Sequence, residues 1–203
     1  MRTSRHPFIN RALYVFSLVL ICLILIFNPA FASVYSPVFW TSWGQIGIEI
    51  GDFMSPSGID LGQDGKVYVA DTFNDRVQAF TIDPISGSVT DVAVFGESGI
   101  DPGTFNGPMG IAVSETYFYV ADTYNHRIQQ FGLDGAFIRS WGSHGTGNGQ
   151  FKRPAAAAID ENNLWIYIAD SLNHRVQKFD LNGRWLSTIG GPGSGSLPGQ
   201  FNN

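Results

Sequence analysis

The sequence predicts an all-β fold: a β-propeller with about three complete four-stranded blades, a leading strand and the start of another blade. A fourteen-residue phrase occurs three times, at 67–80, 118–131 and 166–179, with seven positions identical in all copies. A Gly-x-Phe step precedes each copy and occurs again near the C-terminus. Its phenylalanines are 52, 46 and 50 residues apart. This period fits a sheet of four short strands that stacks on copies of itself.

Each repeat is expected to form four antiparallel strands, because β-branched and aromatic runs alternate with turn sequences such as Asp-Gly and Asn-Gly. The first strand of each repeat is small and apolar, which predicts a crowded place beside the propeller axis. An open β-solenoid is the alternative, although a unit of this length is too long for one coil. In the second repeat we expect the strands at 110–113, 117–121, 127–131 and 136–141.

The first 32 residues have the layout of a secretory signal peptide. Three arginines precede sixteen residues without charge (12–27), and the segment ends in Ala30-Phe31-Ala32. A helix of that apolar run would reach about 24 Å, which is short of a hydrocarbon core of about 30 Å. The sequence therefore predicts a secreted or periplasmic protein, with an uncleaved membrane anchor as the alternative. Cys22, the single cysteine, lies in this segment, so we expect no disulfide in the exported part.

The predicted organisation is therefore a signal peptide at 1–32 and a propeller at 33–203. Within the propeller we expect a leading strand at 33–50, repeats at 51–102, 103–148 and 149–198, and the start of a further repeat at 199–203.

The charge of the exported part argues against binding to nucleic acid. Removal of the segment takes away three arginines, which leaves nine basic residues against seventeen acidic ones and a net charge near −8. A net negative surface repels phosphate backbones, and no basic run offsets it.

The order of motifs resembles the NHL repeat. The order is Gly-x-Phe, then Pro-x-Gly-Ile, then Tyr-Val-Ala-Asp-Thr-x-Asn-x-Arg-Val-Gln-x-Phe, and the resemblance spans roughly 37–203. It implies a propeller, commonly of six blades, whose rim recognises proteins or ligands. Two features depart from the family pattern: only three units are complete, and Pro154-Ala-Ala-Ala replaces the Pro-x-Gly-Ile step. A fragment of a longer propeller and closure by a second chain both remain open.

The turn between the second and third strands and the Gly-rich linker before Gly-x-Phe should share one rim, because strands alternate in direction. Loops on a rigid scaffold usually carry function. The charged and amide residues that recur in this turn are predicted to be structural, since a catalytic residue is needed once and these occur in every unit. They are Asp71, Asn74, Arg76, Asp122, Asn125, Arg127, Asp170, Asn173 and Arg175.

Positions that differ between copies are the candidate binding residues, because the fold does not dictate them. A mixed, solvent-facing rim without a partner is the alternative. Three of these residues are histidines that could bind a divalent metal, but their spacing gives no support, so we predict no metal and no cofactor. The predicted binding rim is Phe73, Asp75, Tyr124, His126, His144, Leu172 and His174.

The sequence thus favours an exported scaffold that binds a protein or small ligand on its rim and is not an enzyme. The resemblance also implies an alternative, a fragment of a metal-dependent lyase or lactonase-like hydrolase with its active-site residues in further blades. The inner strand ends hold Ser57, Met109 and Ala155, none of them histidine. Membrane contact is expected only through an uncleaved leader, and open blade edges offer a route to self-association.

Overall fold

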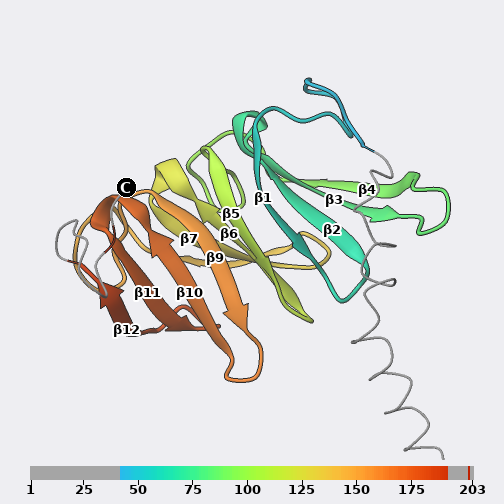
Figure 1. Cartoon of the computed structure of the whole chain (residues 1–203). Helices are drawn as coiled ribbons and strands as arrows, with labels where there is room; N and C mark the ends of the chain where they lie inside the picture. Colours follow the sequence, from blue (N-terminus) through green and yellow to red (C-terminus); the bar gives the residue numbers. More distant parts are fainter. Residues whose placement is uncertain (1–41, 192–200, 202–203) are drawn as a thin grey trace, which may run out of the picture. The chain divides into compact units, whose positions relative to one another are not determined.

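The computed structural model describes residues 42–191 and residue 201 (Figure 1). The predicted signal peptide, residues 33–41 of the predicted leading strand and most of 192–203 lie outside the described residues. Within the described part, no helix is long and apolar enough to span a membrane.

Three four-stranded antiparallel sheets make up the described residues, and in each sheet neighbouring strands follow chain order. Blade 1 contains β1 (Pro56–Leu61), β2 (Lys66–Asp71), β3 (Arg76–Ile82) and β4 (Val89–Phe95). Blade 2 contains β5 (Pro108–Val113), β6 (Tyr117–Asp122), β7 (Arg127–Gly132) and β8 (Phe137–Trp141). Blade 3 contains β9 (Pro154–Asp160), β10 (Trp165–Asp170), β11 (Arg175–Asp180) and β12 (Trp185–Gly190). The prediction of three complete blades is confirmed.

The turns explain why each strand is short. Asp134-Gly135 and Asn182-Gly183 reverse the chain between the third and fourth strands, and their glycines have φ of 86° and 85°. A left-handed conformation of this kind costs glycine little. Between the second and third strands the chain forms a 3₁₀ turn, which the sequence pattern did not predict. These turns are η1 (Thr72–Asn74), η2 (Thr123–Asn125) and η3 (Ser171–Asn173).

The described part of the predicted leading strand, 42–50, forms a loop rather than a strand. Ile46 makes an isolated parallel bridge to Phe53, and Ser98 and His144 make the same bridge to Phe105 and Phe151. The linkers before Gly-x-Phe therefore share one conformation in all three units.

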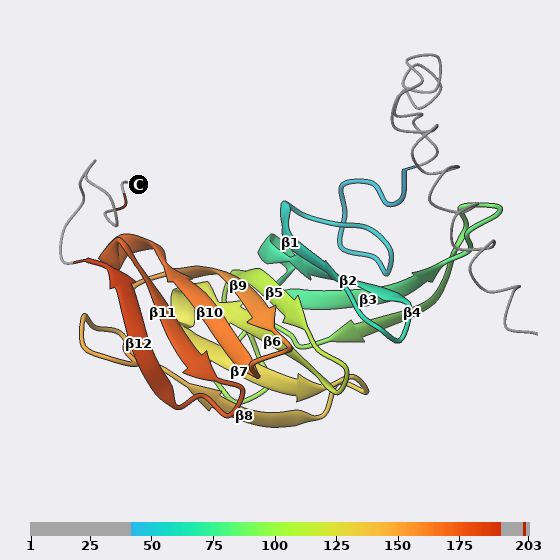
Figure 2. The same ribbon diagram turned by 60° about the horizontal axis from the view of Figure 1, so that its bottom comes forward.

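The blades pack through their first strands, β1 against β5 and β5 against β9 (Figures 1 and 2). A Cβ on Gly58 would lie 2.3 Å from the Met109 carbonyl oxygen. A Cβ on Gly110 would lie 2.6 Å from Ala156 Cα. This close approach confirms the crowded inner position, and it explains why small residues occur there in every repeat.

The hydrophobic core lies between the sheets rather than within them. Tyr68 and Val77 of blade 1 pack against blade 2, and Tyr119 and Ile128 of blade 2 pack against blade 3. The phenylalanines of Gly-x-Phe, Phe105 and Phe151, are completely buried in these layers. Each buried ring contributes about 1.5–3 kcal/mol. Burial between stacked sheets is therefore the main stabilising interaction of the array.

Phe201, the phenylalanine of the fourth Gly-x-Phe step, occupies a place equivalent to that of Phe105 and Phe151. A Cβ on Gly96 would meet the Phe105 ring, and one on Gly142 would meet the Phe151 ring. In the same way, a Cβ on Gly190 would lie 2.6 Å from the ring of Phe201. Phe201 is thus placed as the first aromatic residue of a further unit.

Candidate binding rim

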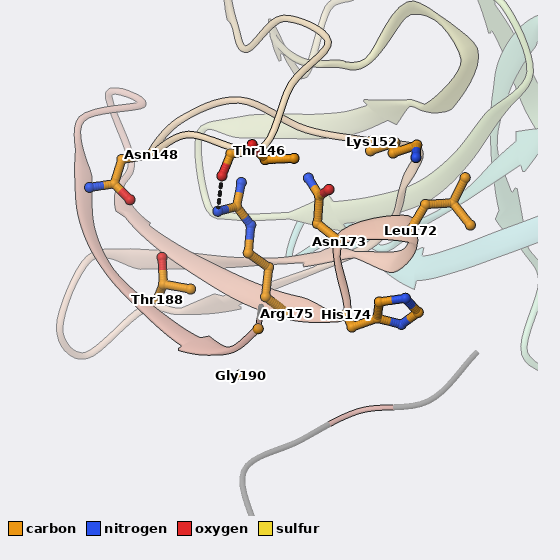
Figure 3. Close-up of a pocket in the computed structure, with 10 residues that line it drawn as sticks. Thr146, Asn148, Lys152, Leu172, Asn173, His174, Arg175, Thr188 and Gly190 are labelled. Carbon is orange, nitrogen blue, oxygen red and sulfur yellow. Dashed lines mark hydrogen bonds between the residues drawn. The ribbon is translucent and has the colours of Figure 1, made fainter. Parts of the chain in front are cut away.

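The rim consists of the turns at 72–76, 123–127 and 171–175 together with the linkers at 45–54, 97–106 and 143–152. Arginine side chains join the two parts. In blade 3, the Arg175 guanidinium donates a hydrogen bond to the carbonyl oxygen of Thr146 at 2.7 Å (Figure 3). It donates another to the carbonyl oxygen of Gly147 at 2.8 Å. Turn and linker therefore lie on one face of the molecule, where the sequence analysis placed its candidate residues.

A buried carboxylate organises each turn. In blade 2, Asp122 is fully buried, and its Oδ2 accepts hydrogen bonds from Arg127 Nε at 2.7 Å, Asn125 Nδ2 at 2.9 Å and Gln129 Nε2 at 3.0 Å. Its Oδ1 accepts one from the backbone N–H of Asn106 at 2.8 Å. Burial raises the pKa of Asp122 above its ordinary value, and the hydrogen bonds and the Arg127 charge offset only part of this rise.

The same network occurs in blades 1 and 3, so the repeated polar residues have internal partners throughout. Asp71 and Asp170 are fully buried, and each pairs with the arginine five positions later. Each asparagine donates to its aspartate and to a carbonyl oxygen of the linker. A buried glutamine completes each network, a role that the sequence analysis did not assign although this residue is identical in all three copies: Gln78, Gln129 and Gln177.

The predicted binding position after the asparagine joins neighbouring blades. Asp75 Oδ1 accepts a hydrogen bond from the backbone N–H of Gly107 at 2.7 Å, and His126 Nδ1 accepts one from that of Arg153 at 3.1 Å. Gly107 and Arg153 are equivalent, two residues after the Gly-x-Phe phenylalanine, and have φ of 56° and 57°. Aspartate and neutral histidine can both accept this bond, so the position acts as a blade-to-blade latch.

Tyr124 and His144 lie at the latch between blades 2 and 3. The Arg153 guanidinium of the next repeat lies 4.9 Å from the Tyr124 ring centroid. The same ring covers Gly107 of its own repeat, where a Cβ would lie 2.3 Å from it. The rings of His126 and His144 are 4.7 Å apart. Burial, together with His144 and Arg153 nearby, lowers the pKa of His126 below its ordinary 6.5. Among the described residues, no three His, Cys, Asp or Glu side chains are grouped to hold a metal.

A hollow of about 420 Å³ lies on the rim of blade 3 (Figure 3). His174 lines it, and its buried Nδ1 has no hydrogen-bond partner among the described residues. On blade 2 the corresponding nitrogen, His126 Nδ1, bonds to Arg153 of the next repeat. The hollow therefore corresponds to a joint between repeats. It is lined by Thr146, Asn148, Lys152, Leu172, Asn173, His174, Arg175, Thr188, Gly190 and Gly191.

Exposed apolar side chains occur on the rim of blades 1 and 2. Phe73, a predicted binding residue, is 61% exposed. The linker that packs on its turn exposes isoleucines that the sequence analysis missed, although the run Ile46-Gly-Ile-Glu-Ile50 is unusually apolar for a loop. Leu172, the equivalent of Phe73 in blade 3, is half-buried. We call this surface the rim patch: Ile46, Ile48, Ile50, Phe73 and Ile100.

Comparison with known proteins agrees with the fold. A family model described as a 6-bladed beta-propeller matches residues 104–194, and one described as the NHL repeat matches residues 53–80. RING finger protein nhl-1 of Caenorhabditis elegans is 42% identical over 67 residues, which are 32% of this chain and 7% of that protein. Peptidylglycine alpha-amidating monooxygenase of Rattus norvegicus is 33% identical over 116 residues, 53% of this chain and 12% of that protein. The matches thus span only a small part of either relative.

Among solved structures, an auxiliary nutrient binding protein from Bacteroides thetaiotaomicron has a TM-score of 0.53 at 17% identity. The match covers 66% of this chain and 38% of that one. At this identity the likeness concerns the fold alone. The threefold repeat, the stacked four-stranded sheets and the two family matches show that the chain contains NHL-type repeats and has the fold of a partial β-propeller.

Proposed function

We propose that this chain is an exported, non-enzymatic NHL-repeat scaffold that binds a protein partner through the rim patch. Export rests on the predicted signal peptide at 1–32. The binding role rests on one observation: the apolar side chains of the rim patch are 61–86% exposed on the face where the loops of the propeller meet. Apolar groups gathered in this way are typical of protein-binding surfaces.

The remaining rim residues support this assignment. The aspartate and arginine of each turn form an ion pair, and the arginine also donates hydrogen bonds to the linker carbonyls. Both charges therefore have partners within the fold. Asp75, His126 and Tyr124 contribute to joints between blades. Of the predicted binding residues, Phe73 and His144 are exposed, and Phe73 is the apolar one of the two. The rim patch is therefore the part of this face most available to a partner.

The test compares two double variants of the full chain. Ile48→Ser with Phe73→Ser removes two anchors of the rim patch. Ile85→Ser with Leu164→Ser changes two apolar residues, 89% and 62% exposed, in turns at the opposite ends of the strands. Anchor residues of an interface contribute more than about 1 kcal/mol each. We therefore expect the first variant to capture about tenfold less of a specific partner from the native exoproteome than the unchanged chain does.

The control variant should capture the same proteins as the unchanged chain, and both variants should unfold at the same urea concentration because the substituted side chains are exposed. Quantitative mass spectrometry of the captured proteins gives the comparison. Identical captured sets for all three chains would refute the rim patch as the binding surface.

A further inference from the structure

The fourth strands of the three blades differ at the position that pairs with the last phenylalanine of the repeated phrase. In blade 2, the Phe137 ring lies edge-on to Phe131 at 5.8 Å and is paired with it in the sheet. In blade 3, Trp185 is the residue paired with Phe179 and packs against the same core. An aromatic side chain from the outer strand therefore covers the last phenylalanine of the repeated phrase in both blades.

Blade 1 lacks this aromatic cover. In blade 2, Gln130 pairs with Arg139, and Phe137 lies two residues before Arg139. In blade 1, the equivalent pair is Ala79 with Ala93, and the residue two before Ala93 is Asp91. Asp91 has φ of 53°, and its carboxylate pairs with Lys66 Nζ at 2.7 Å on the surface. Its side chain therefore belongs to the solvent-facing side of the strand, and Phe80 has no outer-strand ring beside it among the described residues.

A hollow of about 400 Å³ is found at this place. Phe80, Phe53 and Trp43 supply three aromatic walls, with ring centroids 6.0 Å apart for Trp43 and Phe80 and 6.3 Å apart for Phe53 and Phe80. The Trp43 indole is held in position, because its Nε1–H donates to the Gly87 carbonyl oxygen at 2.7 Å. Val89, Val92 and Ile50 complete the apolar lining.

We propose that this hollow binds an aromatic side chain of the protein partner. The sister blades show that a phenyl or indole ring fits beside the equivalent phenylalanine, and aromatic rings favour edge-on contacts of this kind. Ile50 lines the hollow and also belongs to the rim patch, so a chain lying across the patch would place a ring in it. The inference rests on the proposed function for the source of the ring, while the pocket itself can be tested alone.

Indole serves as the probe, and binding to the full chain is followed by saturation-transfer NMR. Val92→Phe adds a ring to a residue that lines the hollow and should fill it from within. Val94→Phe, on the same strand but outside the lining, is the matched control. We expect saturable indole binding to the unchanged chain, at least a fivefold loss of signal with Val92→Phe, and no loss with Val94→Phe.

If Val92→Phe fails to fold, Val89→Phe fills the hollow from the neighbouring part of β4 and replaces it. Equal indole signals for filled and control variants, or a signal that does not saturate, would overturn the inference. The partner assay separates the two proposals. Loss of capture with the rim variant but not with Val92→Phe leaves the proposed function intact and overturns the hollow. Indole binding blocked by Val92→Phe without any rim effect supports the pocket and refutes the proposed surface.

Discussion

At the level of single residues, the repeated aspartate is the residue on which each turn depends. Asp122 accepts four hydrogen bonds while fully buried, so its removal leaves the Arg127 charge without its carboxylate and takes one of two acceptors from the buried Gln129 amide. Breaking one side of a buried ion pair costs roughly 3–5 kcal/mol. We therefore expect Asp122→Ala to lower the free energy of unfolding by that amount in urea titrations.

Asp101→Ala is the matched control, because Asp101 is exposed and only its backbone carbonyl contacts Arg127. Its effect should stay within about 0.5 kcal/mol. Equal effects of the two substitutions would contradict the structural role of the repeated aspartate.

His126 introduces a dependence of stability on pH. Its Nδ1 must be unprotonated to accept the Arg153 N–H, and its pKa in the folded chain lies below the ordinary 6.5. A lowered histidine pKa means that the unfolded chain binds the proton more tightly. The stability from the neutral form is therefore fully present above pH 6.5 and is lost as the pH falls through the folded pKa.

We expect His126→Asp, which copies the latch of blade 1, to flatten the dependence of the free energy of unfolding on pH between about 5 and 7.5. Urea titrations across that interval measure the slope. A slope that is the same in the variant and the unchanged chain would show that His126 does not carry this dependence.

At the level of strands and turns, the sequence predicted what the repeat makes regular. The strands of blade 2 lie within two residues of their expected positions, because aromatic and β-branched runs between Gly-containing turns leave few other pairings. Asp122 and Arg127 could be recognised as a pair, since both recur at fixed spacing in every unit. The 3₁₀ turn between them could not, because three residues carry no periodic signal.

The blade-to-blade hydrogen bond and the aromatic hollow of blade 1 could not be predicted from the sequence for a different reason. Asp75 and His126 differ in charge and size, and what they share is the ability to accept a hydrogen bond from the next blade. Variation at that position therefore indicated a binding residue, whereas the structure gives it a partner in the neighbouring repeat. The hollow arises because the outer strand of blade 1 has Asp91 at the register shift where blades 2 and 3 have Phe137 and Trp185. Neither feature is visible until the sheets are stacked.

At the level of the whole molecule, side chains on the two outer faces of the described array are more exposed than their equivalents between blades. Ile111 and Val113 of blade 2 are 5% and 8% exposed, whereas Ile59 and Leu61, at the same positions of blade 1, are 67% and 65% exposed. On the far side, Tyr167 is half-buried, whereas its equivalents Tyr68 and Tyr119 are fully buried. In a repeat array each sheet is stabilised mainly by its neighbours. Within the described residues, the outer faces therefore contribute less to stability than the joints.

Alanine substitution at one register position in two blades measures this difference. Ile111→Ala removes a side chain from a filled joint and should cost roughly 2–5 kcal/mol of unfolding free energy. Ile59→Ala trims an exposed side chain and should change it by no more than about 0.5 kcal/mol. Equal losses would mean that another sheet covers the blade 1 face in solution. Repeating the titration at lower protein concentration identifies a second copy as that cover, because only an intermolecular contact weakens on dilution.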